Sequence, residues 1–197
     1  MPMMTYRTVP MPLNAAEKLA EAGYFFNRML VLQHNAREFI HNLSAFLSAF
    51  RSITENHLPK QFSKRPVFKE WFARKIQELE ADPLFIFLVE SRNQTVHRGP
   101  IKEVYYQAGP PIPDEGIETN HFEWTHTTVD YGNIICTIKV GKEGQEIRVT
   151  PVVHWVFRLP EERELLTTCR YGLERMDAML GEWQRVLARS PSADAKL

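Results

Sequence analysis

In the first half of the chain, apolar residues recur every three or four positions over several long runs. This spacing places them on one side of an α-helix, so each run predicts an amphipathic helix that buries one face. The connections between the runs are short, which favours antiparallel packing of neighbouring helices. We therefore expect four core helices, which cover residues 14–33, 36–57, 66 to about 80, and 83 to about 98.

Capping and helix-breaking residues set the expected ends of these helices. An asparagine with a glutamate three residues later has the spacing of a capping box. Two such pairs occur, Asn14 with Glu17 and Asn35 with Glu38. Pro66 and the pair Asp82-Pro83 suit the starts of the third and fourth helices. We expect Pro59 to end the second helix, residues 60–65 to form a polar loop, and Gly99-Pro100 to end the fourth helix.

The pattern changes to that of strands in the second half. Residues 99–120 contain several prolines and are predicted to be a loop. Three later runs are rich in β-branched and aromatic residues, at 122–129, 134–140 and 147–157. Short turns separate them, so they predict an antiparallel β-meander. We expect this meander to pack one face on the helices, with Trp155 among its buried residues.

Near the end of the chain, over about 160–188, apolar residues again recur at helical spacing and predict a final helix. Residues 190–197 are expected to be a disordered tail. The predicted fold is therefore mainly α and forms one domain over residues 1–197. It consists of an antiparallel four-helix bundle and a C-terminal helix, with a small antiparallel β-meander inserted at about 99–158.

The amino-acid composition of the chain limits which kinds of function it can have. The chain has 24 basic and 24 acidic side chains and no formal net charge, so a nucleic-acid site would have to be a local basic patch. No run is apolar and long enough to cross a membrane, and the start does not resemble a secretory signal. Cys136 and Cys169 lie far apart in sequence and are expected to be reduced. We expect a cytoplasmic protein with no membrane association and no cofactor.

The residues best suited to chemistry are Arg92, Asn93 and His97, near the end of the fourth helix. An arginine can brace a phosphate, and a histidine can accept a proton near neutral pH. Asn93 and His97 are four residues apart, so they share a helix face. Arg92 is five residues from His97, a rotation of about 500°, which leaves it roughly 140° away. The two could converge if the helix distorts near His97, or if a symmetric second copy contributes its own pair.

An arginine and a histidine near a helix C-terminus also have a purely structural explanation. Both cations interact favourably with the negative end of the helix dipole and need no other role. On spacing alone this explanation is favoured, because a six-residue pattern occurs often by chance.

The surrounding sequence resembles the HEPN superfamily of helical nucleotide-binding domains. The resemblance covers roughly Ala15 to Gly99 and has three parts besides the arginine-to-histidine motif. These are Phe46-Leu47-Ser48-Ala49-Phe50-Arg51-Ser52-Ile53-Thr54 on the second helix, Trp71-Phe72 on the third, and Asp82-Pro83-Leu84 before Arg92-Asn93. The predicted strands do not belong to the common core of that superfamily.

This resemblance implies a dimeric, metal-independent endoribonuclease with the motif in the dimer cleft, in a toxin–antitoxin or defence setting. Arg92 would brace the scissile phosphate, His97 would be the base or acid, and Asn93 would orient it. RNA and an antitoxin-like protein are then the expected partners. The resemblance equally allows a non-catalytic module that binds RNA or protein, and a structural dimer without a ligand is a third alternative.

Weaker candidates lie outside the motif. Arg51 could contact RNA, although a partly buried structural arginine is the favoured interpretation. Lys60, Lys64 and Arg65 form the densest basic run and could attract a polyanion, although such runs are usually just solvated. The histidines of the strand region, His121, His126 and His154, do not have the clustered spacing that zinc requires, so no metal site is expected.

Overall fold

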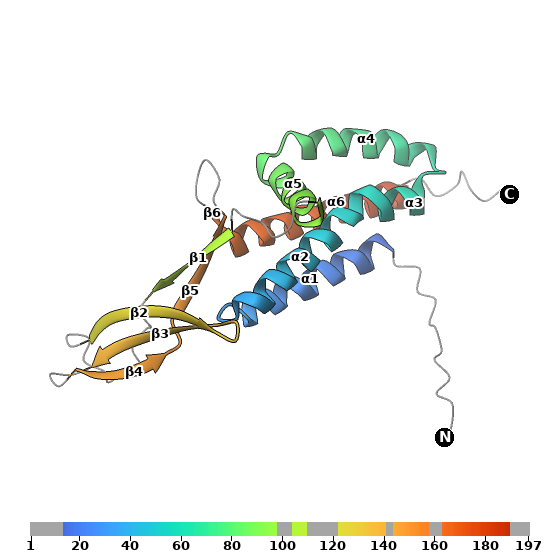
Figure 1. The fold of residues 1–197 in the computed structure, drawn as a ribbon. Coiled ribbons are helices and arrows are strands. Elements are labelled where there is room, and N and C mark those ends of the chain that lie inside the picture. The colour runs from blue at the N-terminus through green and yellow to red at the C-terminus, as the bar shows by residue number, and fades with distance from the viewer. Residues whose placement is uncertain (1–13, 98–103, 110–121, 141–143, 158–162, 190–197) are drawn as a thin grey trace, which may run out of the picture.

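The computed structural model describes residues 14–97, 104–109, 122–140, 144–157 and 163–189, and it is mostly helical with two small antiparallel sheets (Figure 1). The helices are α1 Ala15–Val31, α2 Ala36–Ser52, α3 Leu58–Phe62, α4 Pro66–Glu80, α5 Pro83–His97 and α6 Leu165–Arg189. A π-helical turn, η1 Ile53–His57, joins α2 to α3. The predicted end of α5 at Gly99-Pro100 and the predicted tail at 190–197 lie outside the described residues.

The predicted caps of the helices are present. Asn14 and Glu17 form a complete capping box, in which the asparagine oxygen accepts from the Glu17 amide at 2.8 Å and the glutamate accepts from the Asn14 amide at 2.9 Å. At the start of α2, the Asn35 side chain accepts from the Glu38 amide at 3.1 Å. These contacts satisfy amide groups that have no partner inside the helix, so both helices begin where the sequence indicates.

Pro59 does not end the second helix, and this prediction was wrong. The helical backbone continues through η1 and α3 as far as Phe62, so the loop predicted at 60–65 is reduced to residues 63–65. Pro59 occupies the start of α3, where a proline needs no amide partner. The wider π-helical turn just before it changes the hydrogen-bond pattern at the point where a proline would otherwise clash.

The chain is mainly helical, as predicted, and α1, α2, α5 and α6 contact one another in a central group of helices. α1 packs against α2 and α6, and α5 packs against α2, α4 and α6. The C-terminal helix α6 is therefore part of this group, with Cys169, Met176 and Trp183 almost fully buried. Helix α4 lies at the top of the view in Figure 1 and joins the group through rings, since Phe68 and Trp71 contact Trp183.

The described strands form two three-stranded sheets. Their bounds are β1 Val104–Gly109, β2 Phe122–Asp130, β3 Asn133–Val140, β4 Gln145–Val149, β5 Val152–Phe157 and β6 Arg163–Glu164. One sheet has the order β2-β3-β4 and the other β1-β5-β6, and every pairing is antiparallel. The predicted pair at 122–129 and 134–140 is confirmed as β2 and β3.

Two details of the strand prediction and the predicted start of the final helix were wrong. The run 147–157 is divided between the two sheets, because the chain leaves the ladder at Thr150 and Pro151, and a proline cannot donate to it. Strand β1 lies inside the predicted loop 99–120. The final helix begins at Leu165, because Glu164 pairs with β5 and its carboxylate caps the first turn at the Leu166 amide.

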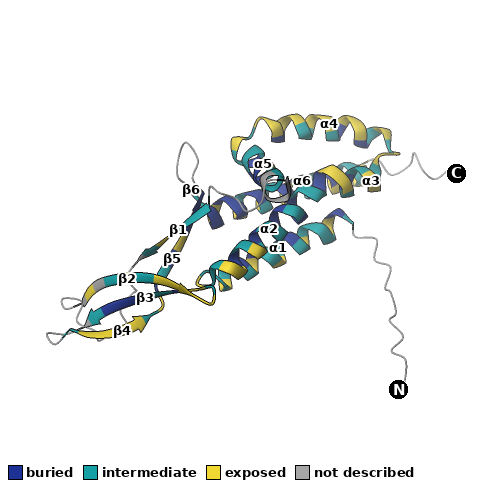
Figure 2. Cartoon of the chain, viewed as in Figure 1, coloured by how far each residue is buried: buried dark blue, intermediate teal, exposed yellow. Residues whose placement is uncertain are grey.

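Strand β5 packs on the helices, as predicted, whereas β3 meets the start of α2 only at its first residues, Asn133 and Ile134. Trp155 is only 3% exposed and stacks on Phe39 with 4.1 Å between ring centroids. Its indole donates to the Gln33 carbonyl at 3.0 Å. In Figure 2 most of β3 is coloured as buried, whereas the neighbouring β4 is coloured as exposed. The prediction that Trp155 is buried is confirmed.

Candidate functional site

Helix α5 carries the predicted motif and is held firmly at its beginning. The Asp82 carboxylate accepts from the Leu84 and Phe85 amides at 3.0 and 3.3 Å, which caps the helix. Its other oxygen accepts from the Tyr171 hydroxyl of α6 at 2.5 Å. This hydrogen bond raises the pKa of Tyr171. Because one side chain serves both helices, the start of α5 is fixed against α6.

The middle of α5 lies unusually close to α6. A methyl group added at Gly172 would lie 2.5 Å from a Leu88 methyl carbon and 3.1 Å from the Phe50 ring. Gly172 is therefore required for the backbone of α6 to approach α5 at this distance. Phe85 and Leu88 are buried on that side, and Ser91 is buried one turn later.

The motif residues lie on the last turns of this fixed helix. The Arg92 and Asn93 side chains are both half-buried. The backbone stays α-helical to His97, whose side chain lies outside the described part of the structure. Position 97 is therefore one turn beyond position 93 on the same face, whereas position 92 is roughly 140° around the axis and about 7.5 Å along it. Within the described α5, no distortion brings positions 92 and 97 onto one face.

Arg51 fits its structural interpretation. Its guanidinium pairs with Glu55 one turn later in the chain, across the junction of α2 and η1. The side chain is only 17% exposed, and its Nη1 is buried without a hydrogen-bond partner in the described part of the chain. The pair with Glu55 supports the structural interpretation, and an RNA contact of Arg51 stays a prediction.

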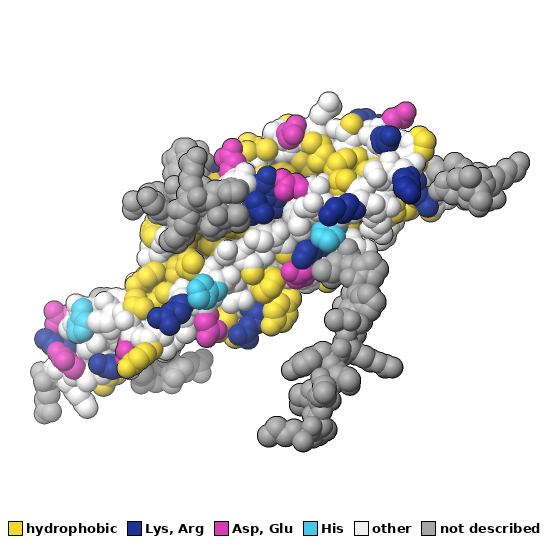
Figure 3. Space-filling model, turned by 45° about the vertical axis from the view of Figure 1, so that its right-hand side comes forward, with side chains coloured by type: hydrophobic (Ala, Val, Ile, Leu, Met, Phe, Trp, Pro, Cys, Tyr) yellow, Lys and Arg dark blue, Asp and Glu magenta, His cyan; other side chains and the backbone are white. Residues whose placement is uncertain are grey.

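The predicted basic run does not surround the motif. Lys60 and Lys64 are exposed and Arg65 is half-buried, at the turn between α3 and α4. In Figure 1 this turn lies at one end of the helices, away from α5. Figure 3 shows basic and acidic side chains interspersed over the visible face, without a large basic patch. Long-range attraction of RNA to this face is therefore weak.

Metal-binding residues do not gather in the described part of the chain, where no group of three or more His, Cys, Asp or Glu side chains could hold an ion. His126 and His154 are exposed on β2 and β5, and His121 lies outside the described residues. Cys136 and Cys169 are free and buried, and burial raises the pKa of the Cys169 thiol well above its ordinary value. Neither thiol is suited to act as a nucleophile.

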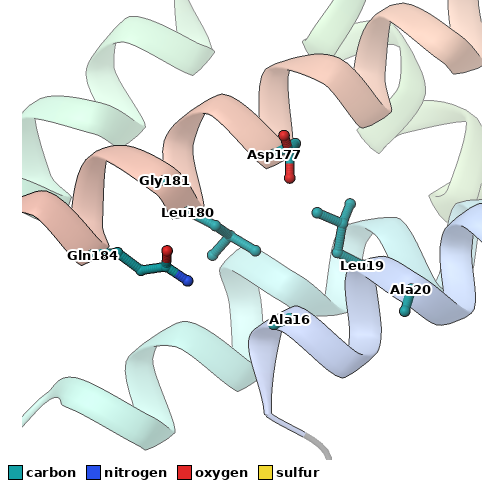
Figure 4. Close-up of a pocket in the computed structure, with 7 residues that line it drawn as sticks. All are labelled: Ala16, Leu19, Ala20, Asp177, Leu180, Gly181 and Gln184. Atoms are coloured by element: carbon teal, nitrogen blue, oxygen red, sulfur yellow. The ribbon is translucent and has the colours of Figure 1, made fainter.

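A groove that the sequence analysis missed lies between α1 and α6 (Figure 4). Its lining residues are Ala16, Leu19, Ala20, Asp177, Leu180, Gly181 and Gln184. A neighbouring hollow extends from it towards α3 and reaches Phe62 and Trp183. The available signal was the small side chains at Ala16, Ala20 and Gly181, which leave space where two helices meet.

Comparison with known protein families, with curated proteins and with solved structures finds no match to this chain. Within the described residues, no helix is both long enough and apolar enough to span a membrane. The resemblance to the HEPN superfamily therefore rests on the motif in α5 and on the sequence patterns that precede it.

Proposed function

We propose that this chain is a HEPN-like, metal-independent endoribonuclease that acts from the last turns of α5, as a toxin or defence component. The observation that carries the proposal is the position of Arg92 and Asn93. Both are half-buried on a helix end whose beginning and middle are fixed by Asp82 and Gly172. A reactive group needs this kind of rigid support to keep its geometry.

The chemistry assigns one role to each motif residue. His97 takes the proton from a ribose 2′-hydroxyl, and the 2′-oxygen forms a bond to the adjacent phosphorus. The bond from phosphorus to the 5′-oxygen breaks, and that oxygen leaves with a proton that it takes from water. The products are a 2′,3′-cyclic phosphate and a 5′-hydroxyl end. Arg92 braces the phosphate with two parallel donors, and Asn93 orients the imidazole from one turn away.

The helical spacing defines how RNA would have to lie. Since positions 92 and 97 are separated around the helix, the RNA must cross the end of α5 rather than run along one of its faces. The long arginine side chain suits this arrangement, because it can reach the phosphate from the side while the histidine meets the ribose.

The same spacing favours a second candidate function. If Arg92 and His97 stay on separate sides of α5, the motif can contact RNA without cleaving it, as a non-catalytic RNA-binding module. The two candidates share their residues and differ only in whether the phosphodiester bond breaks.

Incubation of the purified protein with total RNA in the presence of a chelator distinguishes the two candidates. We expect cleavage with cyclic phosphate ends, and we expect His97→Ala to abolish it. His154→Ala is the matched control, because His154 is exposed on β5 and outside the motif. Binding without cleavage would support the module instead, and equal activity of the wild type and His97→Ala would contradict the proposed chemistry.

A further inference from the structure

The groove between α1 and α6 continues into the neighbouring hollow at α3. Ala16, Leu180 and Gln184 line both of them, so we treat the two as one site and call it the α1–α6 groove. A methyl group added at Gly181, in the wall of this groove, would have no other atom within 4 Å. The groove therefore has space for a bound group beside α6.

One wall of the hollow contains a buried hydrogen-bond donor that lacks an acceptor. Trp183 is only 2% exposed, and its indole Nε1 is buried without a hydrogen-bond partner in the described part of the chain. The rings of Phe62, Phe68 and Trp71 pack around this indole. A buried donor without an acceptor costs free energy, and most such donors in folded proteins have a partner. Because Trp183 lines the hollow, an acceptor bound there would supply the missing partner.

The other side chains of the groove suit an extended peptide. Leu180, Leu187 and Phe62 provide apolar surface, and Gln61 and Gln184 carry amide groups. Grooves lined by aromatic rings bind peptides that contain proline, because such peptides are already extended before they bind. Their backbone carbonyls remain available as acceptors for side-chain donors such as an indole or an amide.

The residues that precede α1 have the composition of such a peptide. Residues 1–13 contain three prolines and four methionines, and the stretch 8–13 has no charged side chain. Pro10 and Pro12 favour extended backbone and have no amide hydrogen that needs a partner. The segment joins the described structure at Asn14, which itself lines the hollow. It is therefore attached to the chain directly beside the groove.

We propose that residues 8–13 bind in the α1–α6 groove of their own chain as an extended segment. The chain reverses close to Leu13 and runs beside α1, and a carbonyl near Pro10 accepts from the Trp183 indole. Since the segment is tethered at Asn14, its effective concentration at the groove is high, on the order of millimolar, and weak contacts suffice to hold it.

The charges support this occupant and its direction. Arg7 is the one charged side chain of residues 1–13, and Asp177 is the one charged residue among the described residues that line the groove. In Figure 4 the Asp177 carboxylate points into the groove, at the opposite end from Gln184. These two α6 positions are about 10 Å apart along the helix, whereas the extended stretch from Pro12 to Arg7 spans about 16 Å. Arg7 can therefore reach Asp177.

This inference does not depend on the proposed RNA chemistry. The described lining of the groove comes from Asn14 and from α1, α3 and α6, and none of it comes from α5, which carries the motif. Failure of the docked segment would therefore leave the proposed cleavage untouched, and a protein that cleaves no RNA could still hold the segment in the groove.

Trypsin cleavage after Arg7 measures how often the segment leaves the groove, because a protease must hold several extended residues on each side of the bond. When docking is fast, the cleavage rate follows the undocked fraction. Gly181→Trp fills the groove and should raise this rate by about tenfold. The matched control is Ala178→Trp, which adds the same ring at an exposed α6 position outside the groove and should leave the rate unchanged. Mass spectrometry would follow the loss of residues 1–7, and circular dichroism would establish that both variants are folded.

A change in the segment itself avoids any effect on the described core. Met11→Asp places a carboxylate in the apolar part of the groove and should also speed cleavage after Arg7 by about tenfold. Met11→Leu, which stays apolar, should retain the slow rate of the wild type. The acidic residue does not make the bond a better trypsin substrate, so a faster rate reports release of the segment.

The direction of the segment has its own test. Asp177→Lys should speed cleavage because it repels Arg7, whereas Asp177→Glu should not. A rise with Met11→Asp but none with Asp177→Lys would overturn this direction. A wild type cleaved as fast as Gly181→Trp and Met11→Asp would overturn the inference. Protection that falls on dilution of the protein would also overturn it, because the segment would then occupy the groove of another copy.

Discussion

Single residues decide where the elements of this protein meet. Gly132 adopts a φ of +89°, and a methyl group there would lie 2.9 Å from the Asn35 side-chain oxygen. Its carbonyl accepts from the Ala36 amide at 2.6 Å, which holds the β2–β3 turn against the start of α2. The residue types at 130–133 predict the turn, but its contact with α2 depends on tertiary structure. A contact between residues so far apart in the chain cannot be predicted from short stretches of the sequence.

Gly172→Ala should destabilise the protein by about 1–3 kcal/mol, a typical cost of forcing an extra carbon into a packed core. Leu88 and the Phe50 ring would have to move to accommodate it. Gly23→Ala is the matched control, because a methyl group there meets no other atom within 4 Å. It should be neutral or stabilising by up to about 1 kcal/mol. Denaturant unfolding of both variants measures the difference, and equal effects would contradict the close approach of α5 and α6.

Glu182 should make the protein sensitive to acid. Hydrogen bonding to Lys75 holds the pKa of Glu182 below its ordinary value of 4.5, and the Trp71 indole also donates to it. The ionised carboxylate therefore contributes stability above about pH 4.5, and this contribution is lost as the pH falls through the lowered pKa.

Removing the cation tests this contribution. In Lys75→Gln, the loss of stability between pH 6 and pH 3 should be smaller than in the wild type. Urea unfolding across that range measures it. An unchanged pH dependence would show that the pair of Lys75 and Glu182 contributes nothing measurable.

At the scale of elements, the sequence predicted most helix starts, because caps are local. Asn14, Asn35 and Asp82 all accept the expected backbone amides. Two features were not predicted, since both depend on how neighbouring segments pack. These are the continuation of the second helical segment through Pro59 and the division of the last predicted strand between two sheets. Strand β1 was missed because its short run lies between proline-containing segments and is recognisable only when paired with β5.

Trp155 should anchor the β1-β5-β6 sheet to the helices. Trp155→Ala should cost about 3–5 kcal/mol, because it removes a buried ring that stacks on Phe39. Trp155→Phe should cost less, since it retains a ring and loses the hydrogen bond to the Gln33 carbonyl. Thermal unfolding would rank the variants, and a Trp155→Ala protein as stable as the wild type would exclude this role.

At the scale of the whole molecule, the sequence predicted a mainly helical protein with antiparallel strands, and it placed the motif on a helix end. It did not predict that α6 joins the central helices, because one amphipathic stripe does not reveal which other helix covers it. The groove beside α1 was missed for the same reason, as it exists only where α1 meets α6. The position of Arg92 relative to His97 followed from helical spacing and needed no tertiary information.

The central claim is that the end of α5 cleaves RNA through attack by the ribose 2′-hydroxyl. The most direct measurement compares one RNA oligonucleotide with its counterpart carrying a single 2′-deoxy group at the mapped cut site, in the presence of a chelator. We expect cleavage of the first to a 2′,3′-cyclic phosphate and no cleavage of the second at that site, because the nucleophile is missing. Cleavage of both at the same bond, or retention of full activity by His97→Ala, would contradict it.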